Sequence, residues 1–271
     1  MRRKKMKKGK VILGFILLSN ILFAHDHILY TPKLDVSGET KVRMKALLAH
    51  PETGKKVRPA SMSTNDEGKT SLPETFFVVH NKQKEELASK VTLEKVSYDE
   101  KGNTVTAYDF IYTDKDGLKG KGNWIFVMEG NTQAHGWNLT STMKVIVAKD
   151  YSGTDFADRV AEGKNEIIPL TSPVKAWKEG VFRGKFVDKD GNPVKNAPVD
   201  IMFMNVDFDV EAGIWKGGEE LPKVRMTTFT DDNGVFAFSP SRAGQWFIKG
   251  TKSFDREKKV VYDASLLVEF E

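Results

Sequence analysis

Along most of the chain, polar and apolar residues alternate or form short apolar runs, a pattern that is typical of β-strands. The runs are rich in β-branched and aromatic residues, and turn-forming clusters separate them. In the first part of the chain the predicted strands lie at residues 40–50, 75–81, 88–98, 104–113, 122–130 and 142–150. Only residues 81–89 and 154–163 have a pattern that allows a short helix. The fold class is therefore predicted to be all-β.

A domain boundary is predicted near residues 165–173, where two prolines bracket a short extended stretch. Beyond it the strand pattern resumes over residues 181–204, 227–250 and 262–271, punctuated by hairpin turns at 188–194 and 230–236. We therefore expect two β-sandwich-like domains, residues 25–172 and 173–271. We also expect the second domain to fold alone.

Residues 1–24 have the pattern of a cleaved export signal. Residues 1–10 carry seven Lys or Arg and no acid, and residues 11–24 are almost wholly apolar and end on Ala24. This apolar run is shorter than the about 20 residues that a membrane-spanning helix needs. Cleavage is thus favoured over an uncleaved anchor. The predicted mature protein begins at His25, is periplasmic and has no stable membrane insertion.

The charge of the chain changes when the signal is removed. The whole sequence has 42 basic and 37 acidic residues, and loss of the seven signal bases leaves 35 basic residues against 37 acidic ones. The mature protein therefore has no excess of positive charge with which to bind nucleic acid. The chain has no cysteine, which excludes disulfides and thiolate metal sites. Any metal ligands must supply nitrogen or oxygen.

Cleavage before His25 would create a chelating group at the new N-terminus. A free amine with histidine at the third position, here His27, suits square-planar Cu(II) or Ni(II). The donors are the amine, two deprotonated backbone amides and one imidazole. If the segment is a strand, the imidazoles of His25 and His27 lie on the same face, which allows a second mode with both rings on one ion. The alternative is a strand with two ordinary solvated histidines.

The remaining histidines also lie in the first predicted domain. His50 and His80 each end an apolar strand pattern, so neighbouring strand ends could bring them to the same ion; otherwise they are ordinary polar residues at strand ends. His135 lies in a predicted loop. The predicted metal ligands are His25, His27, His50 and His80. No signature of a metalloprotease, a serine hydrolase, a P-loop or a dinucleotide-binding fold is present, so we predict that the chain is not an enzyme.

Two resemblances follow from motifs. The patterns G-x-x-x-D-x-x-G-x-P-V-x-x-A-x-V at 184–199 and T-D-x-x-G-x-F-x-F at 230–238 resemble the Cna-B-like and carboxypeptidase-regulatory-like sandwiches, which usually serve as spacers or docking modules. A broader set of motifs lies at 24–32, 49–51, 75–79, 166–177, 180–186 and 233–246. This set is similar to an exported bacterial family, formally a domain of unknown function, described as a periplasmic component of cobalt or nickel transport.

The second resemblance implies a function in metal uptake, with Ni(II) or Co(II) as the bound ion and a membrane metal transporter as a possible partner. Members of that family often carry a histidine where this chain has Val206, which weakens a metal role for the second domain. Nitrogen ligands by themselves favour Cu(II), so a periplasmic copper-binding protein is the alternative. A third alternative is an exported adhesion or scaffold module that binds no metal. Residues 205–222 are expected to form a mobile recognition loop.

Overall fold

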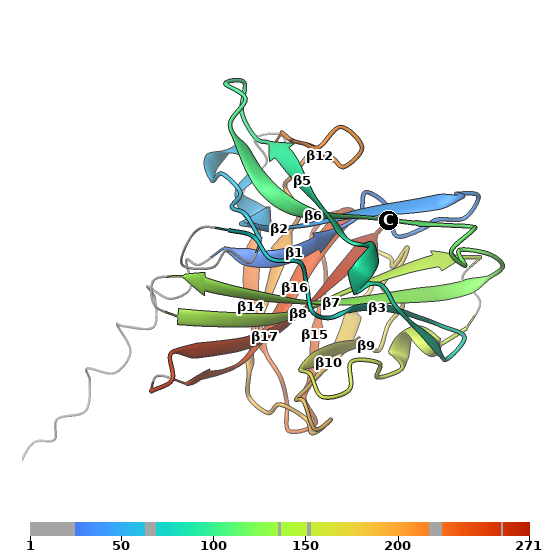
Figure 1. Cartoon of the computed structure of the whole chain (residues 1–271). Helices are drawn as coiled ribbons and strands as arrows, with labels where there is room; N and C mark the ends of the chain where they lie inside the picture. Colours follow the sequence, from blue (N-terminus) through green and yellow to red (C-terminus); the bar gives the residue numbers. More distant parts are fainter. Residues whose placement is uncertain (1–24, 63–68, 135–136, 151–152, 217–223, 256) are drawn as a thin grey trace, which may run out of the picture.

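The structure, a computed structural model, describes residues 25–62, 69–134, 137–150, 153–216, 224–255 and 257–271. It confirms the all-β class, because nearly all of its regular structure lies in three sheets (Figure 1). Their strand orders are β1-β2-β6-β5-β13-β12, β14-β11-β16-β17-β8-β7-β3-β4 and β15-β10-β9. The predicted signal lies outside the described residues. Within those residues, no helix has the length and apolarity needed to cross a membrane.

The strands of the six-stranded sheet are β1 (Asp26–Tyr30), β2 (Lys41–Ala49), β5 (Thr92–Ser97), β6 (Thr104–Thr113), β12 (Phe208–Asp209) and β13 (Ile214–Trp215). Those of the eight-stranded sheet are β3 (Phe76–His80), β4 (Gln83–Glu86), β7 (Gly122–Ala134), β8 (Trp137–Lys149), β11 (Pro198–Phe203), β14 (Arg225–Phe229), β16 (Gly244–Asp255) and β17 (Val260–Phe270). The three-stranded sheet contains β9 (Glu166–Pro169), β10 (Phe182–Val187) and β15 (Val235–Phe238). Three short 3-10 turns are η1 (Pro51–Lys56), η2 (Ala88–Lys90) and η3 (Asp155–Ala157).

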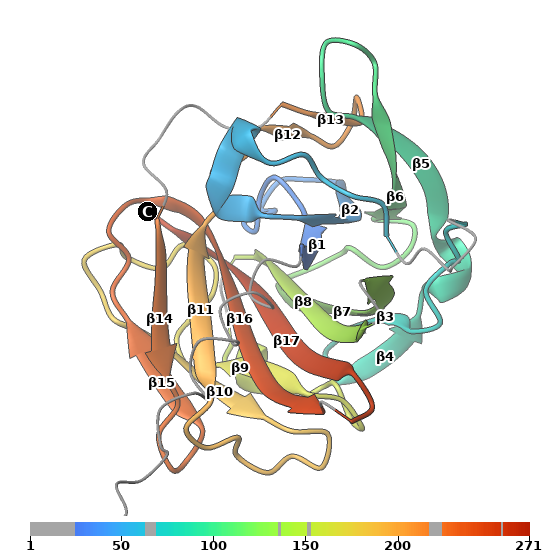
Figure 2. The ribbon, with the colours of Figure 1, turned by 90° about the vertical axis from the view of Figure 1, so that its left-hand side faces the viewer.

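The eight-stranded sheet is the middle layer, with the six-stranded sheet on one face and the three-stranded sheet on the other (Figure 2). Its central strands, such as β16 and β17, are buried on both faces. Along β16, for example, Trp246 and Ile248 belong to the core beneath the three-stranded sheet, whereas Phe247 belongs to the core beneath the six-stranded sheet. Burial on both faces explains the apolar run from Val145 to Ala148 near the end of β8.

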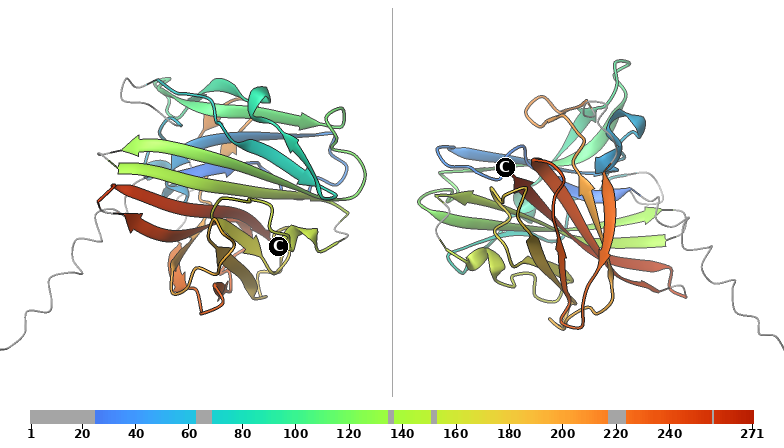
Figure 3. Two further views of the ribbon diagram at one scale, coloured as in Figure 1. Left: turned by 60° about the horizontal axis from the view of Figure 1, so that its bottom comes forward. Right: turned by 180° about the vertical axis from the view of Figure 1, so that it is seen from behind.

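The middle sheet joins the two predicted domains. Strand β8, from residues 25–172, pairs in parallel with β17, from residues 173–271, and the two lie side by side in Figure 3. Both hydrophobic cores contain residues from both sides of the predicted boundary. The structure is thus sandwich-like, but its sheets are not divided between residues 172 and 173. This arrangement argues against the expected independent folding of the second domain.

The two segments whose pattern allowed a short helix do not form an α-helix. Residues 81–89 do not form a helix, because Asn81 and Lys82 have positive φ angles of 50° and 63° and make a tight turn between β3 and β4. In residues 154–163 only the short turn η3 forms. Tight turns form at both predicted hairpin positions, with Gly191 and Gly234 at φ angles of 84° and 74°, which a side chain would disfavour. The strands on either side belong to different sheets, since β10 and β15 lie in the three-stranded sheet and β11 and β14 in the eight-stranded one.

The described part of the expected recognition loop packs against the first half of the chain. Phe208 stacks on Tyr30 with 5.5 Å between ring centroids, and Trp215 is buried. Glu211 pairs with Arg43 at 3.1 Å. Residues 208–215 therefore contribute the strands β12 and β13 to the six-stranded sheet and pack against it. Residues 217–222 lie outside the described part of the chain.

Candidate metal site at the start of β1

The antiparallel pairing of β1 with β2 places His25 opposite His50. The register pairs Asp26 with Ala49, so the preceding residue of β1 faces the residue that follows β2. The backbone N–H and C=O groups of Leu48 both bond to Ala60, away from β1. His27 and Leu48 are therefore a non-hydrogen-bonded pair, and by alternation His25 and His50 are another. Side chains of such pairs lie close together, and the two imidazole centroids are 4.8 Å apart.

The local sequence fixes the position of His50. It lies between the end of β2 and Pro51, and a residue before proline is restricted to extended conformations. Its φ and ψ are −109° and 94°. The turn η1 that follows is held by the second half of the chain, since the N–H of Asn205 donates to the carbonyl of Pro51 at 2.8 Å. Pro51 and the turn η1 thus hold the His50 imidazole in place at the end of β2.

Hydrogen bonding determines which nitrogen of His25 is available for a metal ion. Its Nε2 lies 3.1 Å from the backbone carbonyl oxygen of Arg58. A carbonyl oxygen only accepts hydrogen bonds, so Nε2 carries the proton and donates it. In a neutral ring the lone pair is then on Nδ1. Histidines that bind metals commonly donate their other ring N–H to a carbonyl or carboxylate in this way.

The burial of His50 favours the neutral form of its imidazole. Burial lowers the pKa of His50, and the neighbouring charges of Asp26 and Glu52 act in the opposite direction. The neutral form is the one that binds metal ions.

His27 lies inside the protein rather than beside His25. Its imidazole is buried and its Nε2 lies 2.9 Å from the hydroxyl oxygen of Thr132 on β7. The ring packs against the backbone at Gly130, where an added Cβ would come within 2.5 Å of the ring. The structure therefore does not bring His27 into one site with His25 and His50.

His80 lies at a different place, at the end of β3. Its ring stacks on Trp124 with 4.0 Å between centroids and an interplanar angle of 5°. Its Nδ1 donates to the carbonyl oxygen of Asn123 at 2.8 Å, and Asn81 bonds its Nε2. His80 shares no contact with His25 or His50. His135 lies outside the described residues.

Sequence reasoning missed a layer of buried charges beneath β1. We call it the polar layer, and its members are Asp26, Glu52, Asp200, Arg225, Lys249 and Asp263. Lys249 forms an ion pair with Asp26. Arg225 pairs with Asp200 at 2.8 Å and with Glu52 at 3.4 Å. Asp200, Lys249 and Asp263 interrupt strands that are otherwise rich in apolar residues, and this interruption is the signal of the layer in the sequence.

The polar layer anchors both histidine-bearing segments to the middle sheet. Asp26 follows His25 directly, and Glu52 lies two residues after His50. Burial also raises the pKa of Asp263 to about 6, although the nearby Lys249 lowers it. The layer therefore positions the histidine pair and keeps ionisable groups close beneath it.

The side chains at this site supply two imidazole nitrogens. In the described part of the chain, no group of three or more His, Asp or Glu side chains is arranged to hold a metal ion. A complete site at the histidine pair therefore needs a further donor, which an α-amine at His25 would provide after cleavage. The nitrogen donors fit Cu(II), Ni(II) or Co(II) better than Mg(II) or Ca(II).

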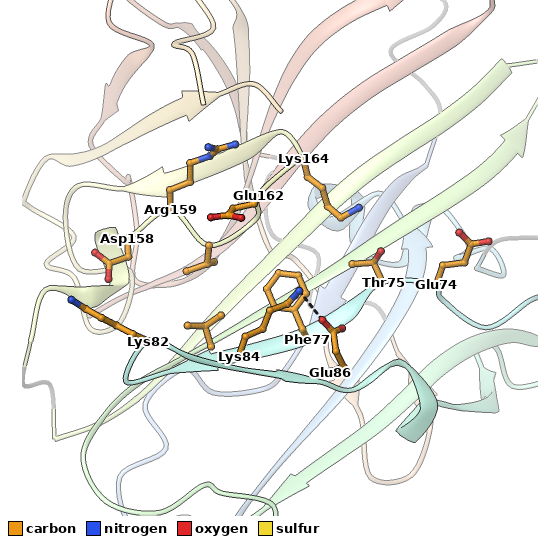
Figure 4. Close-up of a pocket in the computed structure, with 12 residues that line it drawn as sticks. Glu74, Thr75, Phe77, Lys82, Lys84, Glu86, Asp158, Arg159, Glu162 and Lys164 are labelled. Carbon is orange, nitrogen blue, oxygen red and sulfur yellow. Dashed lines mark ion pairs between the residues drawn. The ribbon is translucent and has the colours of Figure 1, made fainter. Parts of the chain in front are cut away.

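Apart from the histidine pair, a hollow with a volume of about 710 Å³ lies between the β3–β4 hairpin and residues 158–164 (Figure 4). Its charged lining consists of Glu74, Lys82, Lys84, Glu86, Asp158, Arg159, Glu162 and Lys164. Lys84 pairs with Glu86 at 2.7 Å, and no histidine lines the hollow. Acids and bases balance there, so this hollow has no charge preference for a metal cation.

The burial of His27 predicts acid-induced destabilisation. Burial, together with the charge of Lys249, lowers its pKa to about 4, whereas the unfolded value is 6.5. The unfolded state therefore binds the proton more tightly. The stabilisation is complete above pH 6.5 and is lost as the pH falls towards 4. Between pH 7.5 and 4.5 we expect wild type to lose about 2.5 kcal/mol more than His27→Gln. Urea unfolding at the two pH values measures this difference; equal losses would contradict it.

The fold and the histidine pair define an all-β protein of three layers with a two-imidazole site at a sheet edge. The chain belongs to the family described as Domain of unknown function (DUF4198), whose model matches residues 22–251. The predicted resemblance to a family of unknown function is confirmed. No curated protein matches the chain.

Solved structures show only distant likeness. E. coli alpha-2-macroglobulin is 11% identical with a TM-score of 0.22, and the match covers 90% of this chain and 16% of that protein. The major pilin subunit BcpA of Bacillus cereus is 12% identical with a TM-score of 0.19, covering 92% and 67%. The group B streptococcus pilus 2b backbone protein is 10% identical with a TM-score of 0.16, covering 84% and 83%. Likeness at these TM-scores says nothing about function.

Proposed function

We propose that this chain is an exported, periplasmic protein that binds a divalent transition-metal ion, nickel or cobalt in the first place, and serves a metal uptake system. The observation that supports this most directly is the pairing of His25 with His50, with their ring centroids 4.8 Å apart. The role is binding and delivery, with no catalytic step. A membrane metal transporter is the natural recipient of the ion.

Two alternatives give different results in the same measurement. Nitrogen donors bind Cu(II) more tightly than Ni(II) and Ni(II) more tightly than Co(II), so a copper-binding protein is the second candidate. The nickel and cobalt assignment comes from the family resemblance and not from the ligands. The third candidate, an adhesion or scaffold module, binds none of these ions in stoichiometric amount.

The test is calorimetric titration of mature protein, whose start at His25 is first confirmed by intact mass, with Ni(II), Co(II) and Cu(II). We expect one ion per chain. His50→Ala should weaken binding at least tenfold, a loss of about 1.4 kcal/mol or more, because one of the two imidazole donors is removed. The matched control is His80→Ala, which removes a histidine distant from the pair and should leave metal affinity unchanged.

The outcomes separate the candidates. Loss of binding in His80→Ala but not in His50→Ala would move the site to the end of β3. Substoichiometric binding of all three ions to wild type would favour the scaffold role. Retention of Cu(II) with no measurable affinity for Ni(II) or Co(II) would favour the copper-binding alternative.

A further inference from the structure

We infer that export cleavage completes the metal site: the α-amine and Nδ1 of His25 chelate one ion, His50 supplies the third nitrogen, and His27 takes no part. This inference rests on the proposed function and adds the donor set and the moment at which the site forms. It differs from the N-terminal chelate expected from the sequence, which uses His27 and two backbone amides.

The tautomer of His25 supports the first part. Because Nε2 donates to the Arg58 carbonyl, Nδ1 is the nitrogen with a free lone pair. Nδ1 is also the ring nitrogen nearer to the main chain of the same residue. A metal ion bound by Nδ1 and the α-amine of His25 closes a six-membered ring through Cα, Cβ and Cγ. The hydrogen bond therefore leaves free the nitrogen that this chelate needs.

The structure opposes the chelate that includes His27. That chelate needs the backbone amides of Asp26 and His27 in deprotonated form and the His27 imidazole on the same ion. Alternation places Asp26 and Ala49 in a hydrogen-bonded pair, so the Asp26 amide is part of the β1–β2 ladder. The His27 ring would also have to leave Thr132 and its buried position. Asp26 itself is held by Lys249.

The third donor is already in place. His50 faces His25 across the ladder, with 4.8 Å between the two ring centroids. Three nitrogens leave at least one position of a tetragonal ion open. An external ligand can occupy this position and be exchanged, as delivery to a recipient requires.

Cleavage also controls when the site exists. Before cleavage the nitrogen of His25 is a peptide amide, which is a poor donor unless it loses its proton. The precursor therefore has only the two imidazoles, and its affinity is lower. A chain that acquires its metal site on export does not withdraw metal ions from the cytoplasm.

The first experiment uses Cu(II), and in parallel Ni(II), with four forms of the protein. These are mature protein from His25, the same protein with one alanine before His25, His27→Gln and His50→Ala. The added alanine and His50→Ala should each weaken binding at least tenfold, whereas His27→Gln should bind as mature protein does. Urea unfolding at pH 7.5 establishes that each variant is folded.

The second measurement needs no variant. Calorimetry of Cu(II) binding in buffers of different ionisation enthalpy counts released protons. The proposed site releases at most about one proton, from the amine, because it deprotonates no backbone amide. The chelate with two backbone amides releases about two more. Its stronger ligand field would also move the visible Cu(II) band to shorter wavelength.

Each outcome has one interpretation. Release of about three protons, with loss of binding in His27→Gln, would overturn the inference in favour of the amide chelate. Full affinity in the alanine-extended protein together with loss in His50→Ala would overturn the inference but leave the proposed function standing. Absence of stoichiometric binding to mature protein would contradict both the inference and the proposed function.

Discussion

Separate expression of residues 25–172 and 173–271 is expected to give two chains without cooperative unfolding transitions. The cut removes the parallel pairing of β8 with β17 and opens the middle sheet at its centre. It also exposes apolar side chains on both faces, because each hydrophobic core contains residues from both halves. Each half would therefore lose a large part of its apolar burial. Circular dichroism during urea unfolding measures the transition.

A control for this prediction is refolding of the two halves together. Mixed in equal amounts from denaturant, they should recover the transition of the intact chain, since the cut lies between β9 and β10 and leaves every described strand whole. A sharp transition of isolated 173–271 would show instead that its own strands suffice for folding. In that case the pairing with β8 would act as docking between two folded domains.

Glu166→Ala is expected to reduce the free energy of unfolding by about 3–5 kcal/mol. Glu166 and Lys144 form an ion pair in which the two side chains are 0% and 1% exposed. The carboxylate also accepts hydrogen bonds from the backbone N–H groups of Val160 and Ala161. Its removal leaves a buried ammonium group without its counter-charge and two amides without their acceptor. Burial lowers the pKa of Lys144, so loss of its proton limits the penalty.

The matched control is Glu86→Ala. Glu86 pairs with Lys84 at 2.7 Å, but the two side chains are 66% and 51% exposed. An exposed pair contributes about 0–1 kcal/mol, so this variant should unfold close to wild type. Urea titrations of both variants at pH 7.5 give the comparison. A loss below about 1 kcal/mol in Glu166→Ala would mean that water replaces the carboxylate.

The strands were the most predictable part of the fold. The pattern over residues 104–113 coincides with β6 (Thr104–Thr113), because alternation and β-branched residues report local burial directly. The pattern over residues 81–89 allowed a short helix that does not form, because Asn81 and Lys82 adopt the positive φ angles of a tight turn, which apolar periodicity does not reveal. The sharing of one sheet by both halves was hidden as well, since pairing between distant strands leaves no local signal.

The candidate site was predictable in part. Export and a mature start at His25 are predictions from the local sequence, and the alternation of side chains along a strand predicts that His25 and His27 share one face. The residues that the His25 and His27 rings contact come from the segments around β2 and β7. His27 is buried because Gly130 leaves room for its ring, and His25 meets His50 because of the β1–β2 register. Neither relationship can be read from spacing along the chain.

The ion pair between Asp26 and Lys249 joins residues that are 223 positions apart. It cannot form until the last strands have emerged and folded, because β16 must first be flanked by β11 and β17. Such long-range closure is slow, since the entropy of ordering a long loop is lost before the contact stabilises it. If the chain is exported as proposed, His25 leaves the export channel early, yet its strand is fixed in place late. Completion of the proposed metal site should therefore follow the slowest folding phase, and metal uptake after dilution from denaturant would report on the last step of folding.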